Sequence, residues 1–187
     1  GAQVMRAFDA GRGGAEWKTP GDPIGATSSR FGAISLGSER MVGFNNIELI
    51  TDRPLEVNLR EIAECKRRYP GHALIVSLMV ESRDDWREII RRVEDTGADG
   101  LELNFGCPHG MCERGMGSAV GQEPEVLKVV AGWAVEFAQL PVLIKLTPNI
   151  GDITVPGVAA VEAGAHGLSL INTIKSIVGV DLDRMVP

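Results

Sequence analysis

Two segments of this chain follow the same order of residues and predict the same local structure. Gly97-Ala98-Asp99-Gly100 leads into an apolar run that ends at Asn104, and Gly164-Ala165-His166-Gly167 leads into another that ends before Asn172. In both segments glycine ends a helix, a strand follows, and an amide side chain stands at the strand's carboxyl end. A strand–helix unit that recurs in this way is typical of an α/β protein with parallel strands.

Five segments have the length and composition of strands. They lie near residues 15–18, 73–80, 99–104, 141–146 and 167–171. The second of them, ALIVSLMV, is almost continuously apolar, as strands buried on both faces of a parallel sheet are. The alternation predicts a (β/α)8 TIM barrel, which has eight strands and typically about 250 residues. Because this chain has 187 residues, we expect residues 1–187 to form a partial barrel domain that lacks the first strand and the last two.

Helix and loop signals complete this prediction. Ser82 and Asp85 fit a capping box, Pro124 stands where a helix begins, and Asp52 and Asp152 precede two further helical segments as candidate caps. Residues 3–10 are also expected to be helical. The segment from Thr19 to about Asn46 is rich in glycine, proline and serine and is expected to form a loop.

The stretch from Leu101 to Gly121 carries the most reactive side chains. Its strand ends on Asn104 and is followed by a glycine-rich loop that contains Cys107, His109 and Cys112. Polar groups just beyond the carboxyl end of a strand are where α/β enzymes place their sites. The loop is therefore the predicted active-site loop.

The same rim of the barrel is expected to carry side chains from the other strands. These are Lys18, Asn104, Lys145 and Asn172. Lys145 interrupts the apolar strand 141–146, and an unpaired buried charge is costly. We therefore expect Lys145 to contact a ligand.

Composition excludes several classes of function. The net charge of −6 argues against a surface for nucleic acid or anionic membranes, and no apolar run reaches the roughly 20 residues that span a bilayer. Three cysteines do not make a disulfide framework, which predicts a reducing, cytoplasmic location. Cys107 and Cys112 have poor spacing for zinc or an iron–sulfur cluster, so no metal site is predicted.

Four motifs then carry a resemblance to a known family. The string from Asn104 to Gly117, NFGCPHGMCERGMG, resembles the active-site loop of dihydropyrimidine dehydrogenases, above all their bacterial catalytic subunit. NIELI at 46–50, KLTPN at 145–149 and Asn172-Thr173 match in the same order. The resemblance covers nearly the whole chain and implies the FMN-binding barrel of that family, which dihydroorotate dehydrogenases share.

The resemblance also implies a reaction and the residues that perform it. Reduced FMN would give a hydride to C6 of uracil or thymine, and Cys107 would protonate C5. The residues implied to hold the pyrimidine are Asn46, Asn104, Asn172 and Thr173. The residues implied to contact FMN are Lys18 and Lys145.

Further groups are implied only outside this chain. Iron–sulfur clusters, FAD and NAD(P)H would belong to other parts of the protein or to an electron-transfer subunit, and the full-length enzyme would be an oligomer. Two alternatives stay open: a barrel enzyme that acts on dihydroorotate, and a truncated chain without activity.

Several side chains near these motifs have competing interpretations. Cys112 competes with Cys107 for the role of the acid, since both lie in the loop. Cys65 lies beside the apolar stripe of a predicted helix and is expected to be structural. His109 is expected to face water, and Gly106 stands where some members of the family carry a hydroxyl residue.

Overall fold

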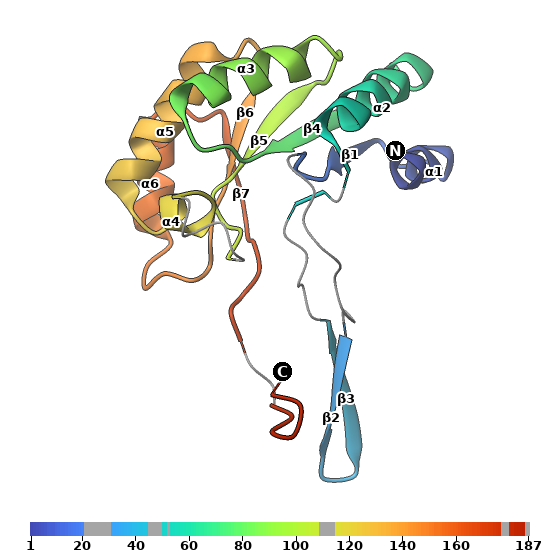
Figure 1. The fold of residues 1–187 in the computed structure, drawn as a ribbon, viewed down its shortest axis with the longest axis vertical. Coiled ribbons are helices and arrows are strands. Elements are labelled where there is room, and N and C mark those ends of the chain that lie inside the picture. The colour runs from blue at the N-terminus through green and yellow to red at the C-terminus, as the bar shows by residue number, and fades with distance from the viewer. Residues whose placement is uncertain (21–30, 45–49, 52, 109–114, 177–179, 186–187) are drawn as a thin grey trace.

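The structure, a computed structural model, describes residues 1–20, 31–44, 50–51, 53–108, 115–176 and 180–185. Five parallel strands form its main sheet, and they are paired in the order in which they occur along the chain (Figure 1). They are β1 (Gly14–Trp17), β4 (Ala73–Leu78), β5 (Gly100–Asn104), β6 (Val142–Lys145) and β7 (Gly167–Ser169). The five predicted strands and their parallel pairing are confirmed.

Helix α1 (Ala2–Asp9) precedes the first strand, and the longer helices that follow later strands lie along one side of the sheet (Figure 1). The other helices are α2 (Leu55–Arg68), α3 (Arg83–Glu94), α4 (Ser118–Gly121), α5 (Pro124–Phe137) and α6 (Thr154–Glu162). Leu101 and Leu103 of β5 are fully buried in the core that also contains Trp86 of α3 and Leu127 of α5. Because side chains alternate along a strand, Glu102 and Asn104 point to the opposite face.

The predicted capping residues that the structure describes form hydrogen bonds at the starts of their helices. Ser82 and Asp85 form a capping box at the start of α3, with each side chain bonded to the other's backbone N–H. Asp152 accepts a hydrogen bond from the Thr154 N–H at 2.9 Å, one residue before the α6 cap at Ile153. Asp52 lies outside the described residues. The short α4 was not predicted, because four residues leave no helical periodicity to recognise.

The prediction of an unbroken loop from Thr19 to about Asn46 is wrong. Strands β2 (Phe31–Leu36) and β3 (Glu39–Phe44) pair antiparallel across Gly37-Ser38 and form a hairpin that projects away from the main sheet (Figure 1). Gly37 has a φ of +63°, a conformation that favours glycine. A Gly-Ser pair between two strand-length runs is a recognised hairpin signal, so the sequence contained the information.

None of the described helices has both the length and the apolar character needed to cross a membrane.

Candidate active site

The predicted rim residues lie where the parallel strands end. Asn104 and Lys145 are the last residues of β5 and β6 and are paired with each other in the register of the sheet. Lys18 directly follows β1 and has an exposed side chain, and Asn172 follows β7. Asn46, which the resemblance implies as a pyrimidine-binding residue, lies outside the described residues.

Asn104 is the centre of a hydrogen-bonded network. Its Oδ1 accepts hydrogen bonds from Asn172 Nδ2 at 2.9 Å, from the Cys107 N–H at 3.1 Å and from the Gly106 N–H at 3.3 Å. Its Nδ2 donates to Thr19 Oγ1 at 3.2 Å. One buried amide thus connects the β5 end, the Cys107 loop and the segment after β7.

Thr19 and Ser77 extend this network and were missed by the sequence reasoning. Their hydroxyl oxygens lie 2.7 Å apart, and both residues are buried. Ser77 is the one hydroxyl in the apolar run of β4, and that interruption was a usable signal. The hydrogen bond from Asn104 to Thr19 depends on contacts between distant strands, which no local pattern reports.

Asn172 and Thr173 are held by hydrogen bonds to each other and to Asn149. Asn172 Oδ1 accepts hydrogen bonds from the Thr173 N–H at 2.7 Å and the Thr173 hydroxyl at 3.2 Å. Asn149 Nδ2 donates to the Thr173 carbonyl at 2.8 Å. Gly106 approaches this segment so closely that a Cβ on it would lie 2.4 Å from Asn172 Cβ. A side chain at position 106 would therefore not fit unless the Asn172 segment shifted.

Cys107 is held in place through its backbone and buried through its side chain. Its N–H donates to Asn104, and its carbonyl accepts a hydrogen bond from the Ser118 N–H at 3.0 Å. The residue is 3% exposed and packs with Ile50, Met79 and Met116. The thiol therefore lies in a largely apolar environment, while the backbone of the same residue is part of the amide network. Cys112 and His109 lie outside the described residues.

Lys145 is not the unpaired charge that the sequence suggested. Its Nζ lies 3.1 Å from Glu102 Oε1 and 3.3 Å from Glu16 Oε2. Burial opposes the ammonium charge, but these two carboxylates outweigh that effect and raise the pKa of Lys145. The lysine therefore keeps its positive charge at neutral pH.

For Glu16, burial and repulsion outweigh the attraction of the neighbouring lysine. Burial and repulsion from Glu102 raise the pKa of Glu16 above its ordinary value, although the attraction of Lys145 opposes them. Cys65 is a free thiol packed in the main core on α2, as expected of a structural cysteine.

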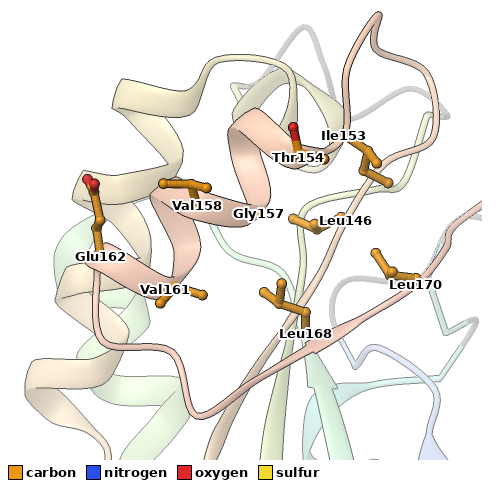
Figure 2. A pocket seen from close by; sticks show the side chains of 9 residues that line it. All are labelled: Leu146, Ile153, Thr154, Gly157, Val158, Val161, Glu162, Leu168 and Leu170. Carbon is orange, nitrogen blue, oxygen red and sulfur yellow. The ribbon is translucent and has the colours of Figure 1, made fainter.

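A separate groove of about 400 Å³ lies between α6 and β7 (Figure 2). Leu168 and Leu170 line one side of it, and Val158 and Val161 of α6 line the other. Its lining is almost wholly aliphatic and lacks the amides and the thiol of the Asn104 network. The groove is therefore not the candidate site.

Comparison with known proteins identifies a matching family and several relatives. The sequence profile of the dihydroorotate dehydrogenase family matches residues 26–185. The chain is 44% identical over 193 residues to the chloroplastic dihydropyrimidine dehydrogenase (NADP(+)) of Arabidopsis thaliana, covering 98% of this chain and 45% of that protein. It is 41% identical over 182 residues to the NAD-dependent dihydropyrimidine dehydrogenase subunit PreA of Escherichia coli, covering 97% and 44%.

A more distant relative carries a different name. The catalytic subunit of dihydroorotate dehydrogenase B (NAD(+)) from Pyrococcus horikoshii is 33% identical over 155 residues, covering 76% of this chain and 49% of that protein. The chain thus spans just under half the length of each of these relatives.

Proposed function

Because the chain belongs to the dihydroorotate dehydrogenase family, whose fold is a TIM barrel, we propose that it carries the pyrimidine site and part of the flavin site of a dihydropyrimidine dehydrogenase. The reaction is the reduction of the 5,6 double bond of uracil or thymine. One observation carries this proposal: the backbone of Cys107 is bonded to the buried amide of Asn104, which is itself bonded to the half-buried amide of Asn172. A neutral, planar ring with carbonyl oxygens fits such a pair without any charged partner.

The hydrogen bonds of the amide pair define what it can recognise. Both side-chain oxygens already accept hydrogen bonds within the protein. The oxygen of Asn104 accepts from Gly106, Cys107 and Asn172, and the oxygen of Asn172 accepts from Thr173. The described residues take up only one N–H of each amide, and a primary amide has two. The pair therefore offers N–H donors to a ligand. We propose that Asn104 and Asn172 bind carbonyl oxygens of the pyrimidine, with Thr173 and Asn46 completing the site.

Cys107 supplies the proton in this proposal. A thiol with an ordinary pKa of about 8.5 is mostly protonated at neutral pH and can act as a general acid. The hydrogen bond from the Cys107 N–H fixes the backbone of Cys107 next to the amide that is proposed to hold the ring.

Lys145 and Lys18 fit the flavin in charge and in place. FMN, when bound, supplies a hydride to C6 of the pyrimidine. Lys145 lies at the same rim as Asn104 and keeps its positive charge, which suits the negative charge of a reduced flavin. Lys18 stands at the end of β1, two residues after Glu16. We propose that both lysines contact the flavin.

Other partners follow from the relatives. The Escherichia coli relative is named as a subunit, and we propose an electron-transfer partner that carries FAD and NAD(P)H, with iron–sulfur clusters outside this chain. The full-length protein is proposed to be an oligomer. Cys65 is a free thiol, which supports a reducing compartment, for which we propose the cytoplasm.

A second candidate substrate is dihydroorotate. The name of the Pyrococcus horikoshii relative favours it. Dihydroorotate differs from dihydrouracil by a carboxylate, which a site would match with a cation. The hydrogen bonds described around Asn104 and Asn172 all come from neutral groups, which supports uracil or thymine.

Substitution of Asn104 tests the proposed role of the amides. Asn104→Asp keeps an oxygen that can accept from the Cys107 N–H but replaces the donor group with an anionic oxygen. We expect pyrimidine turnover per flavin to fall by about one to two decades, because a lost hydrogen bond to a buried group costs about 1–3 kcal/mol. Asn104→Ala removes the loop anchor as well and should lose more. Steady-state kinetics at known flavin content measures both.

The control is Gln3→Glu, which makes the same amide-to-carboxylate change at an exposed position of α1. It should leave turnover unchanged. If Asn104→Asp instead loses its flavin while turnover per bound flavin stays normal, Asn104 holds the cofactor and its assignment to the pyrimidine is wrong.

A further inference from the structure

Glu16, Glu102 and Lys145 form a carboxylate–lysine cluster on the inner face of the sheet. The three residues come from β1, β5 and β6. Strands β1 and β6 are separated in the sheet by β4 and β5, and yet Lys145 Nζ donates to Glu16 Oε2 at 3.3 Å. The sheet is thus curved enough for side chains from strands that are not neighbours to meet.

The cluster contains more negative than positive charge. Glu102 is buried, and its Oε1 has no hydrogen-bond partner of good geometry among the described groups, so the nearby ammonium of Lys145 is its main compensation. Glu102 alone would neutralise Lys145. Glu16, whose side chain is 40% exposed, adds a second carboxylate to the same ammonium.

The second carboxylate has a consequence for any anionic group that Lys145 contacts. Charges in a partly buried site interact strongly at separations of a few ångströms. Glu16 therefore offsets part of the attraction that Lys145 would otherwise exert on a group that becomes negative.

We propose that Glu16 is a positioning residue that competes with the flavin for Lys145 and so lowers the reduction potential of the bound flavin. This inference rests on the proposed function, in which Lys145 contacts the flavin. Removing the charge at position 16 should leave Lys145 free to stabilise the reduced flavin more strongly.

The test uses the flavin-loaded, full-length protein that contains this chain. We expect Glu16→Gln to shift the equilibrium toward reduced flavin by tenfold or more, measured against reference dyes under anaerobic conditions; tenfold corresponds to about 30 mV for a two-electron couple. Glu16→Asp keeps the charge and should stay close to the wild type. Glu162→Gln is the matched control, because it breaks an exposed Glu–Lys pair with Lys128, and it should leave the potential unchanged.

A second measurement does not need the flavin. In the flavin-free protein, the pH dependence of Lys145 acylation, followed by mass spectrometry, should show a lower pKa for Lys145 in Glu16→Gln than in the wild type. An unchanged pKa would overturn the inference at its first step. Bound flavin with an unchanged potential in Glu16→Gln overturns this inference alone, whereas a full-length wild type that binds no flavin overturns the proposed function and this inference with it.

Discussion

Replacing Cys107 with alanine is expected to lower pyrimidine turnover by about 10²–10⁴-fold, the range that general acids contribute. The reason is that the thiol would be the proton source for C5, and that Cys107 is buried with Ile50, Met79 and Met116. Reduction of the flavin by the electron donor should stay near normal, because it does not need this proton. Stopped-flow reoxidation of the reduced flavin by uracil measures the affected step directly.

Three further substitutions make this result specific. Cys107→Ser should resemble Cys107→Ala or fall between it and the wild type, because a hydroxyl is a much weaker acid than a thiol. Cys65→Ala removes a thiol from α2, where burial raises the pKa of Cys65, and it should leave turnover unchanged. Cys112→Ala should also keep turnover near that of the wild type. A slow Cys112→Ala together with a fast Cys107→Ala would show that the other thiol is the acid.

The second large effect is expected from Lys145→Met. It leaves the buried carboxylate of Glu102 without its cation, and breaking a buried pair by removing one partner typically costs about 3–5 kcal/mol of stability. The free energy of unfolding in urea measures this loss. Because the pKa of Lys145 is raised in the folded protein, its contribution is present at neutral pH and disappears only as the pH rises through that raised pKa.

Two comparisons test the cause of this loss. Lys128→Met breaks the exposed pair with Glu162 and should cost at most about 1 kcal/mol. The double variant Lys145→Met/Glu102→Gln should recover part of the stability, since the stranded charge is gone. If the double variant is no more stable than Lys145→Met, the loss comes from packing and not from the buried charge.

The parallel strands and the rim could be predicted because their signals are local. An apolar run of strand length with an amide or lysine at its end places that side chain at the carboxyl edge, and Asn104 and Lys145 indeed end adjacent strands. The β2–β3 hairpin was also within reach, through Gly37-Ser38. Its flanking runs were read as loop because glycine and serine dominate the surrounding segment.

The partners of the site residues could not be predicted in this way. Lys145 meets Glu16 because the sheet curves, and curvature is a property of all the strands together. The oxygen of Asn104 already accepts hydrogen bonds from Gly106, Cys107 and Asn172. Sequence spacing placed the amides correctly but carried no information about which of their atoms remain available.

The central claim is that this chain binds a neutral pyrimidine between the amide pair and Cys107. The most direct test is to reduce the flavin of the full-length protein anaerobically and to mix it with uracil, thymine or orotate while its absorbance is followed. We expect uracil and thymine to reoxidise the flavin, orotate to fail, and Cys107→Ala to slow the reaction with uracil. Rapid reoxidation by orotate without any reaction with uracil or thymine would contradict this account.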